Sequence, residues 1–147
     1  VSVKTRQERI ARISTKDLTK FDVSIYGVVK AMNLAKRNAI FHIVRNLCNH
    51  GVRPSEIAEL IHWRARLFFE VEGQLVSSGF IKAAVAKREA NGRNFDESRW
   101  FCEPEDLIFA DGKTYAFTNQ WGKRWGQAMN LLVKGFPEAK IEYQSSQ

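Results

Sequence analysis

The feature of this chain that most constrains its fold is a pair of helical patterns separated by a short turn. From Asn33 to Cys48, apolar residues recur three and four positions apart, which is the spacing of one face of a helix. Gly51 stands where a helix would end, and Pro54 stands where the next helix would begin. The helical spacing resumes and continues to Ile61, so the sequence predicts two helices joined by a tight turn.

A segment rich in arginine and aromatic residues follows the second predicted helix. We interpret His62–Phe69 as a third helix that presents Arg64 and Arg66 to solvent. The alternative is a plain packed helical layer, because the segment is also rich in large apolar side chains. A fourth helix is expected over residues 77–90, where the helical spacing returns.

Strand patterns occupy the beginning of the chain and part of its last third. Residues 21–25 alternate apolar and polar side chains, and residues 106–118 hold two short apolar runs around Asp111–Gly112, a pair typical of a hairpin turn. A final helix is expected from Asn119 to Gly135, followed by an edge strand. We therefore predict a helix-rich α+β fold with the two-helix unit at its core and one small antiparallel β-sheet.

The chain is basic, with 23 lysines and arginines against 16 aspartates and glutamates and a net charge of +7. Residues 1–20 alone carry a net charge of +4. We therefore divide the chain into a basic N-terminal arm, residues 1–20, and a single α+β domain, residues 21–147. Such an arm is able to lie along phosphates. The alternative is a solvated leader that contacts nothing.

Composition sets further limits on the class of protein. The 147 residues contain no apolar run long enough for a transmembrane helix, and the N-terminus lacks the pattern of a signal peptide. Two cysteines, Cys48 and Cys102, are too few for a disulfide framework. We expect a cytoplasmic protein without a membrane partner, and the initial Val1 suggests an excerpt from a longer chain.

Residues Lys36–Ile61 resemble, in the spacing of their helices, the helix-turn-helix and winged-helix family of DNA-binding domains. The resemblance implies a non-catalytic DNA-binding module in which a helix enters the major groove and a hairpin, the wing, contacts the backbone. It implies DNA contacts by Arg53 near the turn and by Arg64 and Arg66 on the third helix. It also places Lys113 at the tip of the wing, for which the alternative is an ordinary structural hairpin.

A second set of candidate DNA contacts lies just after the predicted hairpin. There Gln120, Lys123 and Arg124 are interleaved with Trp121 and Trp125. Indole rings beside cationic side chains suit stacking on unpaired bases, and an amide can hydrogen-bond a base edge. The alternative is that the two tryptophans, spaced i and i+4, belong to the core-facing side of the last helix.

A nuclease is the second alternative to a DNA-binding module. Glu105–Asp106, Asp111 and Lys113 are similar to the PD-(D/E)xK arrangement, in which carboxylates hold Mg²⁺ and a lysine orients the attacking water. The spacing differs from that arrangement, and Asp111 falls in a turn. His42 and His50 lie two helical turns apart, which is too far for one zinc ion. We expect neither a cofactor nor a bound metal.

The segment Gly112–Gly122 is similar to accessory domains found with bacterial restriction and DNA-defence proteins. That resemblance implies that the chain is the recognition part of such a system. The first alternative to DNA binding is a protein-interaction or assembly domain. It predicts a homo-oligomer or a protein partner, and no salt-dependent affinity for DNA.

Overall fold

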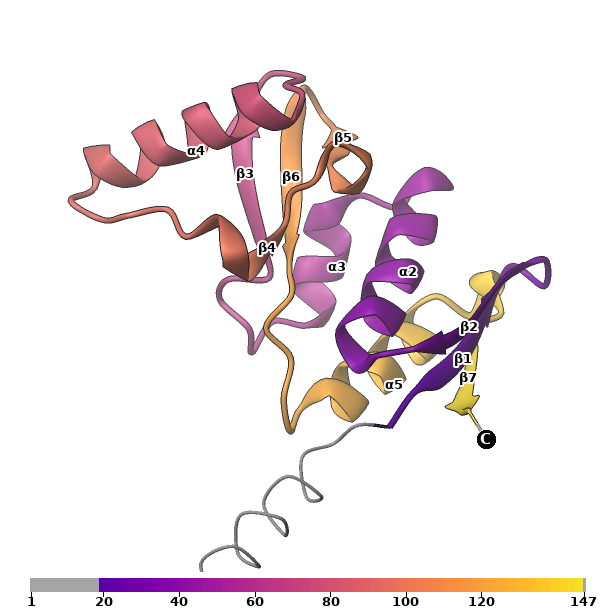
Figure 1. Ribbon diagram of the computed structural model, residues 1–147. Coiled ribbons are helices and arrows are strands. Elements are labelled where there is room, and N and C mark those ends of the chain that lie inside the picture. Colours follow the sequence, from indigo (N-terminus) through magenta and orange to yellow (C-terminus); the bar gives the residue numbers. More distant parts are fainter. Residues whose placement is uncertain (1–18, 147) are drawn as a thin grey trace, which may run out of the picture.

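The computed structural model describes residues 19–146, so the predicted basic arm lies outside this range except for its last two residues. The described chain has an α+β fold (Figure 1). No helix in this range has the length and apolar character that a membrane span requires. The helices are α2 (Lys36–Asn49), α3 (Pro54–Leu60), α4 (Ser77–Ala90) and α5 (Trp125–Gly135), and the 3-10 turns are η1 (Glu97–Arg99), η2 (Pro104–Asp106) and η3 (Pro137–Ala139). The strands are β1 (Phe21–Ile25), β2 (Val29–Leu34), β3 (Phe68–Glu72), β4 (Trp100–Phe101), β5 (Ile108–Ala110), β6 (Lys113–Thr118) and β7 (Glu142–Ser145).

The first two helices are those that the sequence predicts. α2 begins at Lys36, three residues after the predicted cap Asn33, because Asn33 still belongs to β2. Gly51 follows the end of α2 with a φ of +97°, a conformation that favours glycine. Pro54 is the first residue of α3, where its missing N–H leaves no helical hydrogen bond unmade.

The prediction of one sheet is wrong, because the described strands form two antiparallel sheets. Sheet A has the order β2–β1–β7, so the N-terminal hairpin pairs with the C-terminal strand. Sheet B is built on β6, which pairs with β3 along one edge and with β5 and β4 along the other. The predicted hairpin turn joins β5 to β6, and Asp111 and Gly112 have the positive φ values, +52° and +74°, that a two-residue turn of this kind needs.

The predicted third helix is wrong. Residues 62–67 form turns and irregular backbone, and Phe68–Glu72 is the strand β3. Its register runs from Phe68 opposite Phe117 to Glu72 opposite Lys113. Phe69 and Val71 are buried, whereas Glu70 is half-exposed and Glu72 is exposed, which is the alternation of a strand with one solvated face. In the sequence, the apolar run that precedes Glu70 concealed this alternation. The two-helix unit therefore ends at α3, and the next regular element is the strand β3.

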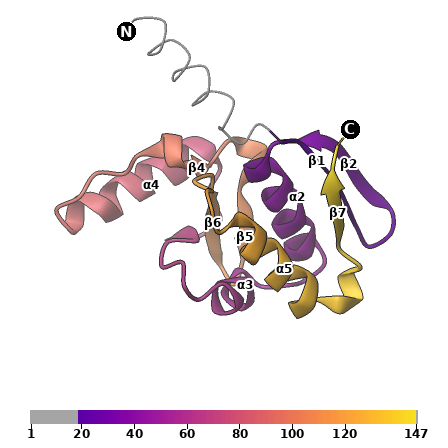
Figure 2. The same cartoon turned by 90° about the horizontal axis from the view of Figure 1, so that it is seen from below.

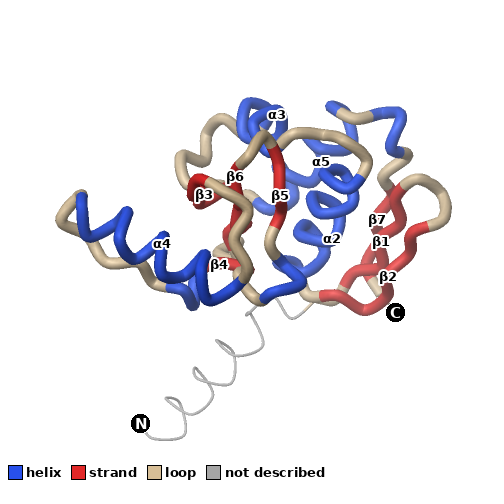
Figure 3. Tube along the Cα trace, turned by 90° about the horizontal axis from the view of Figure 1, so that it is seen from above, coloured by secondary structure: helices blue, strands red, loops and turns tan. Residues whose placement is uncertain are grey.

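Two apolar clusters hold these layers together. The larger joins sheet A, α2, α3 and α5 to the inner face of sheet B, with Ile40, Leu47 and Phe117 fully buried. The smaller lies between sheet B and α4, around Phe69 and Phe80. Figures 2 and 3 show the result from below and from above: α4 packs on sheet B, while sheet A lies beyond α2 and α5.

The last helix begins at Trp125 and not at Asn119 as predicted. The backbone N–H of Asn119 donates to the carbonyl of Arg99 at 3.1 Å, and that of Gln120 donates to Oγ1 of Thr118 at 3.2 Å. These two bonds hold the segment against η1 and prevent it from starting the helix. Trp125 is buried, which confirms the core alternative for this residue.

Candidate functional site

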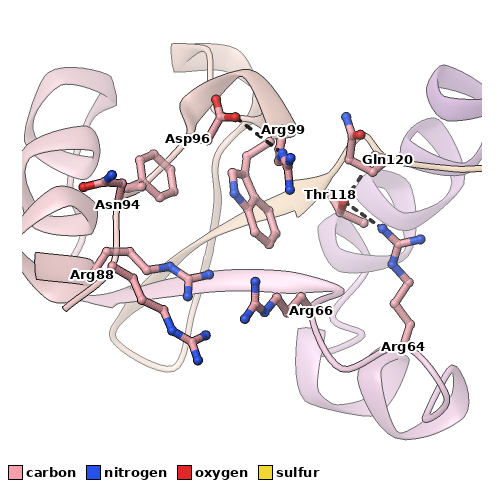
Figure 4. A pocket seen from close by; sticks show the side chains of 11 residues that line it. Arg64, Arg66, Arg88, Asn94, Asp96, Arg99, Thr118 and Gln120 are labelled. Atoms are coloured by element: carbon pink, nitrogen blue, oxygen red, sulfur yellow. Dashed lines mark hydrogen bonds and ion pairs between the residues drawn. The ribbon is translucent and has the colours of Figure 1, made fainter. Parts of the chain in front are cut away.

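Five arginines gather around one surface hollow of about 320 Å³ beside sheet B, which we call the arginine pocket (Figure 4). Arg64 and Arg66 lie in the loop before β3, and Arg88 lies in the last turn of α4. Arg93 and Arg99 lie in the segment that leads from α4 to β4. The other residues that line the pocket are Asn94, Phe95, Asp96, Trp100, Thr118 and Gln120.

The arginine pocket concentrates positive charge. Figure 4 shows Arg88 and Arg66 reaching toward each other from α4 and from the loop before β3. Burial lowers the pKa of Arg88, and the neighbouring charges of Arg66 and Arg93 lower it further. Asp96 is the one acidic lining residue, and its Oδ2 lies 3.4 Å from Nε of Arg99. The other four guanidinium groups have no carboxylate partner within residues 19–146.

Sheet B orients two of these arginines. Nη2 of Arg64 donates to Oγ1 of Thr118 at 3.2 Å, and Cζ of Arg64 lies 4.7 Å from the centre of the Trp121 ring. Cζ of Arg88 lies 4.9 Å from the centre of the Phe69 ring. Burial also lowers the pKa of Arg64. Side chains held in this way lose less conformational entropy when they bind an anion.

A wider hollow of about 640 Å³ adjoins the arginine pocket at Gln120, which lines both. Its cationic side chains are Lys36 and Arg37 at the start of α2 and Lys123 in the loop before α5. We call it the lysine hollow. Its remaining lining residues are Ala35, Asn119, Trp121 and Gly122. The two basic hollows are therefore neighbours on the surface.

The structure brings together four of the residues that the sequence singled out as DNA contacts. Arg64, Arg66 and Gln120 line the arginine pocket, and Gln120 and Lys123 line the lysine hollow. Their association depends on the pairing of β3 with β6, which brings the loop before β3 next to the end of β6.

Arg124 lies outside both hollows. Its Cζ is 3.8 Å from the centre of the Trp63 ring, and its Nε donates to Oε1 of Gln127 at 3.1 Å. These contacts give Arg124 a structural role between the loop after α3 and the start of α5.

Arg53 and Lys113, the predicted turn and wing contacts, lie at the end of β3 and β6 that is remote from the arginine pocket. There Nζ of Lys113 is 2.9 Å from Glu70 and 3.8 Å from Glu72, and Nε of Arg53 is 3.8 Å from Asp111. We call these five residues the hairpin-tip cluster. The hydrogen bond to Glu70 is the largest of the contacts that raise the pKa of Lys113. Each cation here has a carboxylate partner.

The residues of the nuclease alternative are not brought together. Lys113 pairs with Ala110 beside the hairpin turn, whereas Glu105–Asp106 precede β5 at the other end of the ladder. Asp106 instead lines a separate hollow of about 320 Å³ with His42. Among residues 19–146, no three His, Cys, Asp or Glu side chains are placed to hold one metal ion. These residues therefore do not form the PD-(D/E)xK arrangement.

Sequence reasoning missed Arg88, Arg93 and Arg99. It treated this segment as a helix end followed by a polar loop. The available signal was Phe95 between Arg93 and Arg99, with Trp100 directly after Arg99, because cations interleaved with aromatic residues are typical of nucleic-acid surfaces. That signal alone does not reveal the pocket, whose other wall comes from the loop before β3.

The chain has no significant match among models of known protein families, curated protein sequences or solved structures. The resemblances of Lys36–Ile61 and Gly112–Gly122 to DNA-binding and DNA-defence domains therefore stay predictions. The function of the chain has to be inferred from the geometry and charge of the site itself.

Proposed function

We propose that the chain is a DNA-binding module without catalytic activity of its own, and that DNA lies in the arginine pocket and the lysine hollow. The observation that carries the proposal is the convergence of five arginines on one hollow lined by a single carboxylate. Arginine presents a planar fork of donors that matches phosphate oxygens. Phosphate groups would relieve the repulsion among these arginines, and DNA supplies them at regular intervals.

The proposed mode of binding differs from the one that the helix-turn-helix resemblance implies. Arg64 and Arg66 project from a loop beside sheet B, so we assign them to phosphates and not to base edges. Gln120 is exposed between the two hollows, and its Nε2 donates to Oδ1 of Asn119 at 2.6 Å. Its Oε1 is the atom that we expect to accept a hydrogen bond from a base.

The proposal includes a cytoplasmic location. Cys48 forms no disulfide within residues 19–146. Burial raises the pKa of Cys48 to about 12 and that of Cys102 to about 11, so both stay protonated at neutral pH. Protonated, unreactive thiols fit a reducing compartment.

The test is fluorescence anisotropy of a labelled duplex and a matching labelled single strand, titrated with protein at several salt concentrations. We expect affinity to fall steeply with salt, with a log–log slope of about 0.9 per phosphate contact on duplex and about 0.7 on a single strand. The double substitution Arg66→Gln/Arg93→Gln removes two exposed pocket arginines and should lower the affinity about tenfold or more.

The matched control is Lys134→Gln/Lys140→Gln. It removes the same charge from two exposed lysines that line neither hollow. We expect the control to change the affinity by less than about twofold at physiological salt, because distant surface charges are screened. Equal losses in the two variants would mean that only the net charge matters, which would overturn the role of the pocket.

Absence of binding at low salt would overturn DNA binding altogether. The protein-interaction alternative would then stand in its place. Val28 and Met32 would mark the surface to search, because they are 81% and 68% exposed in the β1–β2 turn and on the edge strand β2.

A further inference from the structure

We propose that the arginine pocket receives the terminal phosphate of a DNA strand, and that the strand leaves the pocket across Gln120 into the lysine hollow. The inference rests on the proposed function and specifies which part of the DNA the pocket selects. An internal phosphodiester carries one negative charge. A terminal phosphate monoester carries roughly 1.5 to 2 negative charges at neutral pH and offers three acceptor oxygens.

The density of charge differs between the two hollows. In the arginine pocket, four guanidinium groups that have no carboxylate partner among the described residues surround a volume of about 320 Å³. In the lysine hollow, three cationic side chains surround a volume of about 640 Å³. A dianion with three acceptor oxygens can accept from several of the crowded guanidinium groups at once. The sparser cations of the lysine hollow suit successive single charges along a backbone.

The walls of the arginine pocket indicate where a bound strand would end. The end of α4, the loop before β3 and the η1–β4 segment border the arginine pocket (Figure 4). Gln120 lines both this pocket and the lysine hollow. Arg88 and Asn94 lie on the side of the pocket opposite Gln120 (Figure 4), so a strand that enters at Gln120 meets α4 and the loop that follows it. The pocket is therefore suited to the end of the strand.

Aromatic side chains line the same pocket. Phe95 and Trp100 are half-buried there, and their ring centres lie 5.0 Å and 5.8 Å from that of Phe69 in sheet B. Rings fixed in this way offer an apolar wall to the sugar or base of the last nucleotide. This wall complements the charged groups that hold the phosphate.

The test uses three single strands of one sequence with an internal fluorescent label, so that both ends are free. One strand has a 5′-phosphate, one has a 3′-phosphate, and one has hydroxyl groups at both ends. We expect the protein to bind one of the phosphorylated strands about tenfold more tightly than the hydroxyl strand, because of the added charge-assisted hydrogen bonds. Equal affinity for the three strands would overturn the inference.

Two variants separate this inference from the proposed function. Arg66→Gln/Arg93→Gln should abolish the preference for the phosphorylated end, whereas Lys123→Gln should weaken binding of all three strands by a similar factor and keep the preference. The protein could bind all three strands equally, with an affinity that depends on salt and on the pocket arginines. That outcome would support the proposed function and overturn this inference. No binding to any strand would overturn both.

A competition experiment identifies the source of the phosphate monoester. A nucleoside monophosphate of the preferred polarity is added to the complex with the phosphorylated strand. We expect it to displace the strand only at concentrations at least about tenfold above the strand's own dissociation constant, because it lacks the contacts of the lysine hollow. Displacement at equal concentrations would assign the pocket to a free nucleotide and overturn the inference.

Discussion

The arginine pocket and the hairpin-tip cluster occupy opposite ends of β3 and β6. They differ in how many of their cationic side chains are paired with a carboxylate. In the hairpin-tip cluster, both cations lie within 3.8 Å of a carboxylate. In the arginine pocket, Arg99 is paired with Asp96, while its four neighbours have no such partner in the described chain. The two regions contain the same kinds of residue, yet only the pocket presents a surplus of charge to an anion.

The comparison shows that the net charge of a chain does not locate its anion-binding surface. To bind a phosphate, Lys113 would have to give up its 2.9 Å contact with Glu70. A pocket arginine without a carboxylate partner has no such contact to lose. Breaking an existing ion pair costs most of the free energy that a new ion pair with phosphate contributes. We therefore expect the affinity for DNA to come from the arginine pocket.

The largest expected effect comes from removing the packing that holds α4 on sheet B. Phe80 is fully buried and its ring centre lies 6.2 Å from that of Phe95 in the pocket wall. Phe80→Ala should lower the free energy of unfolding by about 3–5 kcal/mol. The matched substitution Phe109→Ala, on the half-exposed hairpin strand β5, should cost less than about 1.5 kcal/mol. Urea unfolding of both variants checks this, and equal losses would contradict the assignment of Phe80 to the core.

The next effect is on affinity and concerns two neighbouring cations at the end of α4. Arg88 lines the arginine pocket, whereas Nζ of Lys87 donates to the carbonyl of Glu70 at 2.7 Å. Arg88→Gln should weaken DNA binding by about 1–3 kcal/mol, and Lys87→Gln should change it by less than about 0.5 kcal/mol. Anisotropy titrations at one salt concentration measure both. A larger loss of affinity for Lys87→Gln than for Arg88→Gln would mean that DNA contacts the side of α4 that carries Lys87 and not the arginine pocket.

The smallest expected effect is on the free energy of unfolding, which one substitution in the pocket should raise and one in the hairpin-tip cluster should lower. The charge of Arg93 lies near the like charge of Arg88, so Arg93→Gln should slightly raise the free energy of unfolding at low salt. Lys113→Gln removes the contacts with Glu70 and Glu72 and should lower it. Denaturant unfolding in low and high salt checks both signs. The same sign for the two substitutions would remove the contrast between the regions.

The contribution of Lys113 to stability should also depend on pH. The hydrogen bond to Glu70 raises the folded-state pKa of Lys113 above its ordinary 10.5. A raised lysine pKa means that the stabilisation is complete below about 10.5 and is lost as the pH rises through the folded-state pKa. The difference in unfolding free energy between the parent and Lys113→Gln should therefore shrink above pH 10.5. A constant difference would show that Lys113 acts without its charge.

Local signals in the sequence determine much of this fold. Gly51 and Pro54 end one helix and begin the next, because each has the backbone conformation that its position needs. Asp111–Gly112 makes the hairpin for the same reason. Such signals depend only on residues a few positions apart, so the sequence alone was enough to place α2, α3, α4 and the β5–β6 hairpin.

Long-range pairing decided the rest. Phe68–Glu72 is a strand because it forms a full ladder of hydrogen bonds with β6, which lies more than forty residues later in the chain. No local sequence pattern predicts that pairing. That pairing places Arg64 and Arg66 beside Thr118 and Gln120, and the packing of Phe80 against sheet B adds Arg88 and the loop that follows α4. The sequence by itself determined the number and the kind of charges. The tertiary structure decided which charges are neutralised by carboxylates and which are left to bind an anion.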